Sequence, residues 1–587
     1  MSINTQSLQP IINFIWTVAD DVLVNVYQKG KYKDVILPMV VIRRLDMLLE
    51  PTKDKVLETF KNYKTKLQNL DNLLTNSKHG SGLAFYNTSP FTLKKLLDDP
   101  KNLRSNFENY LNGFSENVQD IINKFRFRNE IETLADGEIL YLLIEKFVSP
   151  KIELHPDRLP PLAMGYIYED LVRRFNEENN EEAGEHFTPR EIIDLMTHLV
   201  FLPVKDKIKN GTYLIYDPCV GSGGMLTIAK KFIQDPEGDI KSKATVHLYG
   251  QDSTPFIYAT CKSDMLIKGE DPNKIVYGST LSQYGFPEDL KFDFMLTNPP
   301  YGKTWAPDKK ALGFGPKGAI TDKRFQVGHS RVNDGQLMFV LHMLSKMKDT
   351  ELGSRIASVH NGSALFTGDA GGGESEIRKY IIENDLLEAI IALPNDMFYN
   401  TGIPTYIFIF SNRKAKNRKG KIQLINATSE VFYKKMRKSL GKKRVEYTSE
   451  NIKQITKLFL DFKEGEYSKI FDNEDFGYSQ IIVHRPERDE QGNIVTDKKG
   501  NSKSDSNLRD YENIPLKDDI QNFFEKEVLP FAQDAWWNKD ETRTGYEINF
   551  NKYFYKYTPP RSLKEIAADL FAIEVETENL LKEIIST

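Results

Sequence analysis

Cysteine is nearly absent from this sequence, which has only Cys219 and Cys261 in 587 residues. Two cysteines cannot build a disulfide framework, and the nine histidines are too scattered to indicate a zinc site. We therefore expect no metal site, and we expect a protein that works in a reducing compartment, the cytoplasm.

Long apolar runs are missing as well. No stretch approaches the length of a membrane span, and residues 1–6 lack the basic and apolar parts of a signal peptide. The charges nearly balance, with 79 basic and 83 acidic residues and a net charge of −4. These features argue against a membrane protein and against a general polyanion binder, so any surface for nucleic acid must be local.

Length and periodicity predict three regions. Residues 1–165 have apolar side chains at helical spacing, which predicts an N-terminal helical domain that serves as a scaffold or docks DNA or a partner. Residues 166–430 alternate short apolar strands with helices and form an α/β domain. Residues 431–587 form a C-terminal region that is mostly helical from Tyr447 onward, apart from the polar, disorder-like segment 487–508.

Seven short apolar runs in the middle region predict a seven-stranded, mainly parallel sheet. The first four runs each end in a turn of glycine or polar residues. Such strand ends meet at one edge of an α/β sheet, which is where these folds bind ligands. The runs are residues 213–216, 245–249, 275–277, 292–297, 356–359, 389–393 and 405–410.

The fourth strand leads into Asn298, Pro299, Pro300 and Tyr301. The two prolines lack N–H donors and force a sharp turn. The Asn298 side-chain oxygen and the Pro299 carbonyl could accept both hydrogens of an exocyclic amine such as adenine N6, which would free the nitrogen lone pair to attack an electrophilic methyl group. Tyr301 could stack on an extruded base. Taken alone, four residues could equally be an ordinary proline turn.

A glycine-rich turn, from Asp217 to Gly224, follows the first strand and allows close approach of a ligand to the backbone. It lacks the Lys-Ser/Thr of a P-loop and the GxGxxG pattern, so it suits a ligand with cationic groups and no pyrophosphate. Asp252, at the end of the second strand, stands where an acid can bind both hydroxyls of a ribose. Cys219 follows a proline, as a cytosine-methylating nucleophile would, but it lies in this turn and a buried apolar role is favoured.

Residues 185–189 precede a helix predicted to begin near Glu191. Thr188 can cap this helix, with Pro189 at its first position. A capped helix start explains these two residues, but it does not explain why the element stands just ahead of the glycine-rich turn.

The order of EHFTP (185–189), DPCVGSGG (217–224), Gln251-Asp252 and NPPY (298–301) resembles the N6-adenine DNA methyltransferases of the gamma arrangement. The likeness is closest to the modification subunit of type I restriction-modification systems. It extends over nearly the whole chain, because NGSALF (361–366), residues 393–403, KSLGKKR (438–444) and GYEI (545–548) match as well.

This resemblance implies a Rossmann-like methyltransferase fold and S-adenosylmethionine as cofactor. The residues that would bind the cofactor are Glu185, His186, Phe187, Thr188, Pro189, Asp217, Gly221, Ser222, Gly223, Asp252 and Asn298. The residues that would act on the target base are Asn298, Pro299, Pro300 and Tyr301. Two positions depart from the family pattern, because Asp252 stands where glutamate is frequent and Ser279 stands where an acid is common near the adenine of the cofactor.

The resemblance also implies partners: double-stranded DNA, a DNA specificity subunit, a second copy of this chain, and a motor-nuclease subunit where the system cleaves DNA. Two basic segments suit phosphates, with a local charge of +5 in 303–331 and +12 in 413–444. The last helix places apolar residues at alternating spacings of three and four from Leu563 to Ile584. This heptad seam could pack on a partner helix or fold back on the protein's own core.

Three alternatives to the type I modification subunit remain at this point. The first is a stand-alone adenine DNA methyltransferase. The second is a protein glutamine methyltransferase, since such enzymes use a similar Asn-Pro-Pro-Tyr turn; the helical N-terminal domain and the basic segments disfavour it. The third is a non-catalytic DNA-binding subunit, which the intact catalytic turn disfavours.

Overall fold

The computed structural model describes residues 8–155, 157–178, 188–313, 320–399, 401–497, 499–555 and 562–585. The chain divides into two compact units, Met1–Ile548 and Asn549–Thr587. Among the described residues, no helix combines the length and the apolar character needed to cross a membrane.

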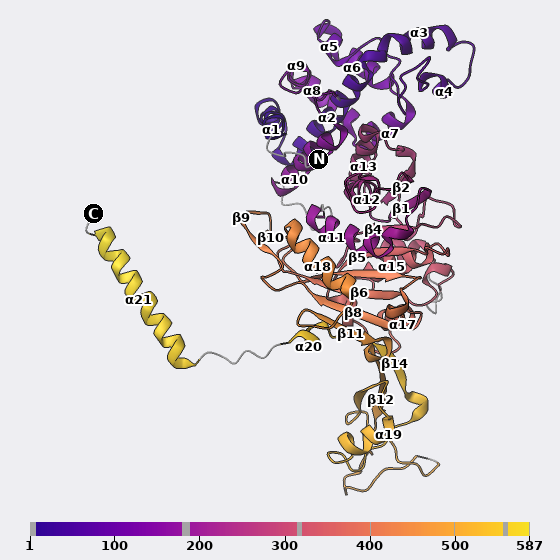
Figure 1. The fold of residues 1–587 in the computed structure, drawn as a ribbon, viewed down its shortest axis with the longest axis vertical. Helices are drawn as coiled ribbons and strands as arrows, with labels where there is room; N and C mark the ends of the chain where they lie inside the picture. Colours follow the sequence, from indigo (N-terminus) through magenta and orange to yellow (C-terminus); the bar gives the residue numbers. More distant parts are fainter. Residues whose placement is uncertain are drawn as a thin grey trace. The chain divides into compact units, whose positions relative to one another are not determined.

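The N-terminal part of the first unit is a helical bundle, as predicted (Figure 1). Helix α2 buries most of its side chains, from Tyr32 to Leu49, among the surrounding helices. The bundle contacts the α/β part through Asp120, which accepts hydrogen bonds from Tyr258 and Lys262. The helices are α1 (Gln9–Leu23), α2 (Tyr32–Leu49), α3 (Lys53–Tyr63), α4 (Asp71–Leu74), α5 (Leu93–Leu96), α6 (Leu103–Asn112), α7 (Glu116–Lys124), α8 (Phe127–Asp136), α9 (Leu140–Val148) and α10 (Pro161–Glu178).

The centre of the first unit is a nine-stranded sheet in the order β11-β8-β6-β7-β5-β4-β1-β2-β3. Neighbouring strands from β5 to β3 are parallel, whereas β7 is antiparallel to β5 and β6, and β11 is antiparallel to β8. The strands are β1 (Thr212–Asp217), β2 (Thr245–Asp252), β3 (Ile275–Tyr277), β4 (Phe294–Thr297), β5 (Arg355–Asn361), β6 (Leu387–Leu393), β7 (Thr405–Ser411), β8 (Lys421–Asn426) and β11 (Ser468–Asp472).

The seven predicted strands are all present, but the predicted strand number is wrong because β8 and β11 extend the sheet by two. Both lie in sequence that is rich in lysine or polar residues. Their inward-facing residues, such as Leu424 and Ser468, are buried only because β8 pairs with β6 and β11 pairs with β8. Long-range pairing of this kind leaves a weak local signal in the sequence.

Helices cover both faces of the sheet, so its central strands are buried on both sides and mostly apolar. On one face, α11 packs on α12, α18 and the central strands. On the other face, Tyr216 stacks on Phe292, and its hydroxyl lies 3.1 Å from Nε2 of His342 in α15. The helices of this part are α11 (Arg190–Phe201), α12 (Gly224–Gln234), α13 (Pro255–Lys268), α14 (Ala306–Ala311), α15 (Gln336–Ser345), α16 (Ser363–Phe366), α17 (Gly373–Glu383) and α18 (Ser449–Asp461).

The region after Tyr447 contains more strand than the sequence predicts. After α18 and β11, a small antiparallel sheet has the order β13-β12-β14, and segment 487–508 forms isolated β-bridges instead of the expected disorder-like loop. Arg378 of α17 donates to the carbonyl of Tyr546, which ties this sheet to the larger one. The remaining elements of the first unit are β9 (Lys434–Leu440), β10 (Lys443–Glu446), β12 (Gly477–Val483), β13 (Asp510–Pro515), α19 (Ile520–Phe523) and β14 (Arg543–Tyr546).

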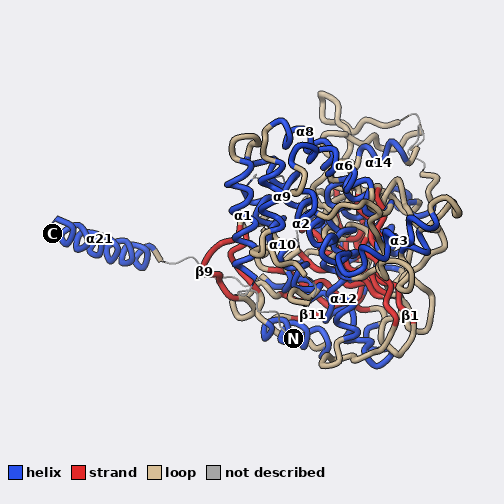
Figure 2. The backbone as a smooth tube through the Cα atoms, turned by 90° about the horizontal axis from the view of Figure 1, so that it is seen from above, coloured by secondary structure: helices blue, strands red, loops and turns tan. Residues whose placement is uncertain are grey.

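The second unit contains α20 (Phe550–Phe554) and the long helix α21 (Leu563–Ile585), which is seen from above in Figure 2. The seam predicted from the heptad spacing lies on this helix. Its described apolar side chains are exposed, for example Leu563 at 86%, Leu570 at 63% and Ile573 at 58%.

Candidate active site

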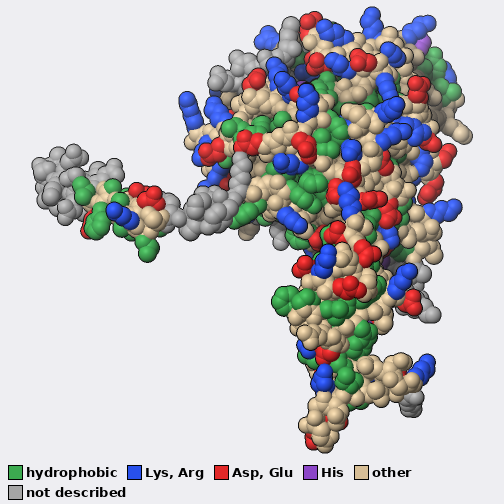
Figure 3. Space-filling model, turned by 60° about the horizontal axis from the view of Figure 1, so that its bottom comes forward, with side chains coloured by type: hydrophobic (Ala, Val, Ile, Leu, Met, Phe, Trp, Pro, Cys, Tyr) green, Lys and Arg blue, Asp and Glu red, His purple; other side chains and the backbone are tan. Residues whose placement is uncertain are grey.

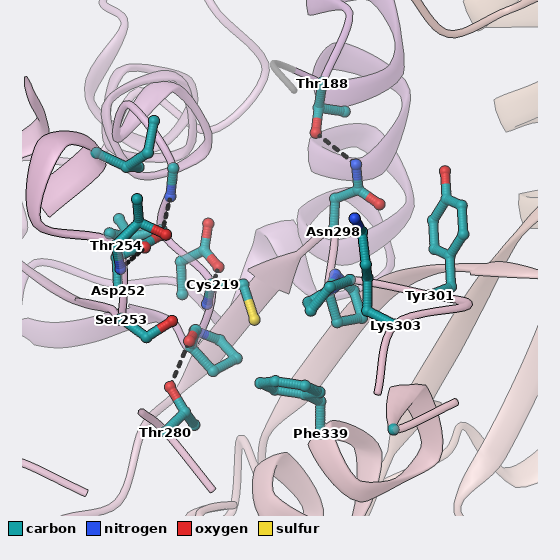
Figure 4. Close-up of a pocket in the computed structure, with 18 of the residues that line it drawn as sticks. Thr188, Cys219, Asp252, Ser253, Thr254, Thr280, Asn298, Tyr301, Lys303 and Phe339 are labelled. Atoms are coloured by element: carbon teal, nitrogen blue, oxygen red, sulfur yellow. Dashed lines mark hydrogen bonds between the residues drawn. The ribbon is translucent and has the colours of Figure 1, made fainter. Parts of the chain in front are cut away.

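A cavity of about 790 Å³ opens where β1, β2, β4 and β5 end, at the sheet edge that the sequence predicts (Figure 4). Its volume lies in the range of about 300–1,000 Å³ that is usual for small-molecule sites. Most of the predicted site residues line it: Thr188, Asp217, Gly221, Ser222, Asp252, Asn298, Pro299, Pro300 and Tyr301. Pro189 and Gly223 adjoin lining residues in the chain, and Glu185, His186 and Phe187 lie outside the described residues.

The glycine-rich turn leads from β1 into α12. Gly221 and Gly223 have φ angles of 54° and 83°, in the left-handed region that glycine adopts without strain. A Cβ at Gly223 would lie 2.6 Å from the end of the Met265 side chain, whereas a Cβ at Gly221 would meet no atom within 4 Å. The turn therefore packs tightly on α13 at Gly223 and leaves open space against the backbone at Gly221.

Asp217 is buried at the base of this turn, with 1% of its surface exposed. Its Oδ1 accepts hydrogen bonds from the Thr297 hydroxyl at 2.7 Å and from the Cys219 N–H at 3.0 Å. Burial still raises the pKa of Asp217 to about 7. A cationic ligand beside this carboxyl would favour its ionised form.

Asp252 connects the end of β2 to the glycine-rich turn. Its Oδ1 accepts from the Thr254 N–H at 2.9 Å, and its Oδ2 accepts from the Gly221 N–H at 3.3 Å. Each carboxylate oxygen can accept more than one hydrogen bond. These contacts hold the carboxylate at the cavity wall.

Asn298 is the most unusual group in the cavity. Its Nδ2 donates to the Thr188 hydroxyl at 3.1 Å (Figure 4). Its Oδ1 is buried and has no hydrogen-bond partner among the described residues. Leaving a buried acceptor unpaired costs about 1–3 kcal/mol. The bond on the nitrogen fixes the direction of this oxygen, and the described residues supply no donor to it.

Thr188 has a different role from the predicted one. Helix α11 begins at Arg190 with Pro189 at its N-cap, and no side chain caps it. The extended conformation of Pro189, with ψ of 139°, moves Thr188 out of capping position. Its hydroxyl instead accepts from Asn298, so this residue orients the side chain of Asn298.

Aromatic and apolar residues form the far side of the cavity from the glycine-rich turn. Tyr301 is half-buried, and burial raises its pKa to about 12, so the phenol is neutral near pH 7. Phe339 of α15 and the exposed Ile403 also line this side. These surfaces offer ring faces and apolar contacts to a flat, uncharged group.

An arginine that the sequence analysis counted only as part of a basic loop supports the cavity. The guanidinium of Arg324 donates to the carbonyls of Thr280 at 3.0 Å and Leu281 at 2.6 Å, both cavity residues, and is paired with Asp322. The Thr280 hydroxyl donates in turn to the Pro218 carbonyl. Charge density alone could not distinguish this residue from exposed lysines nearby.

Cys219 also lines the cavity. Burial raises the pKa of its thiol well above the ordinary value, with Asp217 as a further cause. The thiol is therefore protonated near pH 7, which agrees with the prediction that it is no nucleophile. Within the described ranges, no cluster of His, Cys, Asp and Glu could hold a metal ion.

The profile of the N-6 DNA methylase family matches residues 162–483, which is more than half of the chain and includes every wall of this cavity. The chain belongs to this family. The profile of the HsdM N-terminal domain matches residues 11–147, which form most of the helical bundle.

This N-6 DNA methylase is similar to methylase subunits of type I restriction enzymes, both in sequence and in fold. It is 25% identical over 484 residues to the type I restriction enzyme MjaIX methylase subunit of Methanocaldococcus jannaschii, covering 77% of both chains. It is 30% identical over 272 residues to the HindI methylase subunit of Haemophilus influenzae, covering 46% of this chain and 55% of the relative. The crystal structure of a type I methyltransferase subunit from Streptococcus thermophilus shares the fold, with a TM-score of 0.60, 20% identity, and coverage of 80% of this chain and 96% of that one.

These comparisons confirm two predictions from the motif order. The chain is a modification subunit of the type I kind, and its fold is that of an α/β methyltransferase with an N-terminal helical domain. A DNA adenine methylase is accordingly favoured over a protein glutamine methyltransferase and over a non-catalytic subunit.

Proposed function

We propose that this N-6 DNA methylase transfers a methyl group from S-adenosylmethionine to N6 of an adenine that has been extruded from double-stranded DNA. The observation that carries the proposal is the buried, unpaired Oδ1 of Asn298 in a cavity whose other half, the donor half, is lined by Asp217, Gly221 and Asp252. An amine that donates to this oxygen satisfies the one buried side-chain polar atom of residues 298–301 that the described protein leaves without a partner.

The donor half of the cavity fits S-adenosylmethionine. Asp217 would face the ammonium group of its zwitterionic amino-acid end, the open backbone at Gly221 would allow close approach, and Asp252 would accept from both ribose hydroxyls. Thr280 and Leu281 would lie near the adenine of the cofactor, where the family often has an acid and this chain has Ser279. Glu185, His186 and Phe187 would complete the methionine side, with Thr188, Pro189, Ser222 and Gly223 supporting the turns.

Asn298 and Pro299 would act on the target amine. S-adenosylmethionine supplies the electrophilic methyl group. The Asn298 Oδ1 and the Pro299 carbonyl accept the two amine hydrogens, which draws the nitrogen lone pair out of conjugation with the ring. Tyr301 stacks on the base and Pro300 fixes the turn, while the surplus proton leaves the methylated nitrogen for solvent.

DNA would lie across basic residues near the cavity mouth. Basic and acidic side chains are interspersed over the face seen in Figure 3, so the DNA surface must be local. The β9–β10 hairpin is one such surface, and it is anchored by Lys443, which is buried and paired with Glu191 at the start of α11. Its exposed basic residues are Lys434, Lys435, Arg437, Lys438, Lys442 and Arg444.

Sequence choice would come from a separate specificity subunit, because phosphate contacts carry no sequence information directly. A second copy of this chain and a motor-nuclease subunit complete the assembly that the resemblance implies, in the cytoplasm of a prokaryote. The exposed seam of α21, represented by Leu563, Leu570 and Ile573, is our candidate contact with the specificity subunit.

The reaction is tested with the assembly that purifies from source cells. Incubation with DNA and S-adenosylmethionine labelled on the methyl group should yield N6-methyladenine as the labelled base. Label in N4-methylcytosine, or in protein, would contradict the proposal. Methylation of one defined site by the isolated chain would show that it is a stand-alone enzyme.

The subunit role is tested by deleting residues 561–587. The shortened chain should keep the affinity of the full chain for S-adenosylmethionine, and it should no longer co-purify with its partner. Normal assembly and site methylation by the shortened chain would show that the seam of α21 is not the contact.

A further inference from the structure

Asn361, the last residue of β5, lines the same cavity as the catalytic turn but has no part in the reaction described above. β5 is the parallel neighbour of β4, whose end carries Asn298. The ends of adjacent parallel strands lie side by side, so the amide of Asn361 belongs to the half of the cavity that receives the target base.

The orientation of the Asn361 amide follows from its neighbours. The Gln336 Nε2 donates to the carboxylate of Asp334 at 2.8 Å, and the Gln336 Oε1 accepts from the backbone N–H of Asn361 at 3.2 Å. A carboxylate can only accept and a backbone N–H can only donate, so the two ends of the Gln336 amide are identified. Buried, neutral His360 contacts the same oxygen.

This assignment settles which end of Asn361 is the oxygen. The atom that lies 2.7 Å from the Gln336 Nε2 must be an acceptor, and it also accepts from the Ser363 N–H at 3.0 Å. It is therefore Oδ1, held on the protein side. The Nδ2 of Asn361 makes no hydrogen bond within the described part of the chain, so two N–H donors are left for the cavity.

The same network fixes Asn361 relative to the catalytic turn. Asp334, which binds Gln336 through Oδ2, accepts from the Gly302 N–H through Oδ1 at 3.1 Å. Gly302 directly follows Tyr301. A single carboxylate thus connects the end of the catalytic turn to the residue that orients Asn361, and the two cannot shift independently.

We propose that Asn361 is a specificity-determining residue that donates a hydrogen bond from Nδ2 to a ring nitrogen beside the target amine. This inference rests on the proposed function. Asn298 and Pro299 present two acceptors to the amine, and Asn361 presents a donor. Adenine offers the complementary set, because its N6 amine is flanked by the acceptors N1 and N7. Guanine and thymine carry a carbonyl in place of this amine, which would face the two acceptors.

The experiment uses the assembly purified from source cells and a duplex with the site it methylates. The target adenine is replaced by 1-deaza-, 7-deaza- or 3-deazaadenine, and single-turnover methyl transfer is measured. With the wild-type chain, either the 1-deaza or the 7-deaza base should be methylated on the order of 10- to 100-fold more slowly than adenine. The 3-deaza base, altered on the far edge, serves as the control.

Asn361→Ala should slow methyl transfer to adenine by a similar factor. This variant should then methylate adenine and the analogue that slows the wild type, 1-deaza- or 7-deazaadenine, at nearly the same rate. Asn361→Asp, which puts an acceptor where the donor was, should be slower than Asn361→Ala on adenine. Ser363→Ala, which removes a hydroxyl from the supporting network but leaves the Nδ2 donor, should keep the wild-type sensitivity to the analogue. Calorimetry with S-adenosylmethionine should give the wild-type affinity for each variant, which shows that the fold is intact.

Two outcomes would overturn the inference. One is a wild-type assembly that methylates all three analogues as fast as adenine. The other is an Asn361→Ala variant that is slowed by the analogue by the same factor as the wild type. The rate losses from the substitution and from the analogue would then multiply, which means that the two groups do not interact. A wild-type assembly that methylates no adenine would instead refute the proposed function. Failure of the Asn361 inference can therefore be distinguished from failure of the proposed function.

Discussion

The two halves of the cavity differ in how completely the protein satisfies their polar groups. In the donor half, the carboxylates of Asp217 and Asp252 each accept two hydrogen bonds from the protein. In the base half, which contains Asn298, Tyr301 and Asn361, Oδ1 of Asn298 is buried and has no hydrogen-bond partner among the described residues. Nδ2 of Asn361 also has no hydrogen-bond partner among them.

This difference indicates how the two halves work. The donor half holds its own shape through strand ends and a glycine-rich turn, so it should bind its ligand without DNA. The base half carries a donor and an acceptor that the described residues leave unsatisfied, so binding energy should become available when the base enters. Substitutions in the two halves should therefore have separable effects.

The largest effect should come from Asn298→Ala. Loss of Oδ1 removes an acceptor that acts on the amine, so the rate of methyl transfer should fall by ~10²–10³. Affinity for S-adenosylmethionine should stay within about threefold of the wild type, because the donor half is intact. Transfer is measured with labelled donor in the full assembly, and affinity is measured by calorimetry.

Thr188→Val is the matched control for Asn298→Ala. It leaves Oδ1 in place but removes the hydroxyl that holds Nδ2. The rate should fall less than in Asn298→Ala, because the side chain keeps its acceptor and loses only its orientation. Equal losses in the two variants would mean that the Asn298 oxygen does not act on the amine.

The second effect should appear in the donor half. Asp252→Ala removes the acceptor for the ribose hydroxyls, and loss of charge-assisted hydrogen bonds costs roughly 1.5–3 kcal/mol, or about 10- to 100-fold in affinity for S-adenosylmethionine. At saturating donor the transfer rate should recover most of its wild-type value. Asp252→Asn keeps one acceptor oxygen, so its affinity for S-adenosylmethionine should lie between those of the wild type and Asp252→Ala. An unchanged affinity in Asp252→Ala would contradict the assignment of Asp252 to the ribose.

The sequence located several residues that line the cavity, because their positions follow from a local pattern. The strand-end positions of Asp217, Asp252 and Asn298 could be located because each follows an apolar run and precedes a turn, which is a local pattern. The nine-stranded sheet could not be predicted in full, because β8 and β11 become strands through pairing with distant segments.

Supporting residues were missed for a related reason. Arg324 and Gln336 act on residues far away in the chain, since Arg324 contacts Thr280 and Gln336 contacts Asn361. Nothing in the local sequence distinguishes these two side chains from exposed ones. The mistaken capping role of Thr188 has the same origin, because its actual partner, Asn298, is 110 residues away.

The third prediction concerns Arg324, which links the loop after the catalytic turn to the donor half. Arg324→Lys keeps the charge but cannot donate to both the Thr280 and Leu281 carbonyls. The KM for S-adenosylmethionine should rise about tenfold, with a smaller change in kcat. Lys323→Ala, an exposed neighbour with the same charge, is the control and should leave the KM for the donor unchanged. A KM for the donor that stays unchanged in Arg324→Lys but rises in Lys323→Ala would show that charge alone matters.

The smallest effect is a pH dependence of donor binding that comes from Asp217. Burial raises its pKa to about 7, far above the value in an unfolded chain, so the folded protein favours the protonated carboxyl. The stability from this group is complete at low pH, and it is lost as the pH rises toward 7. Donor binding should change in the opposite direction, because the ionised carboxylate attracts the ammonium group of S-adenosylmethionine.

With a pKa of about 7, the ionised fraction of Asp217 rises roughly fivefold between pH 6 and pH 7, and donor affinity should rise by up to that factor. Asp217→Asn retains an oxygen for the Thr297 and Cys219 hydrogen bonds but cannot ionise. Its donor affinity, measured by calorimetry, should be nearly flat over this pH range, and its unfolding free energy should fall less than that of the wild type as the pH rises. If both proteins show the same pH dependence of donor affinity, another group must titrate, and the ammonium group of the donor does not lie against Asp217.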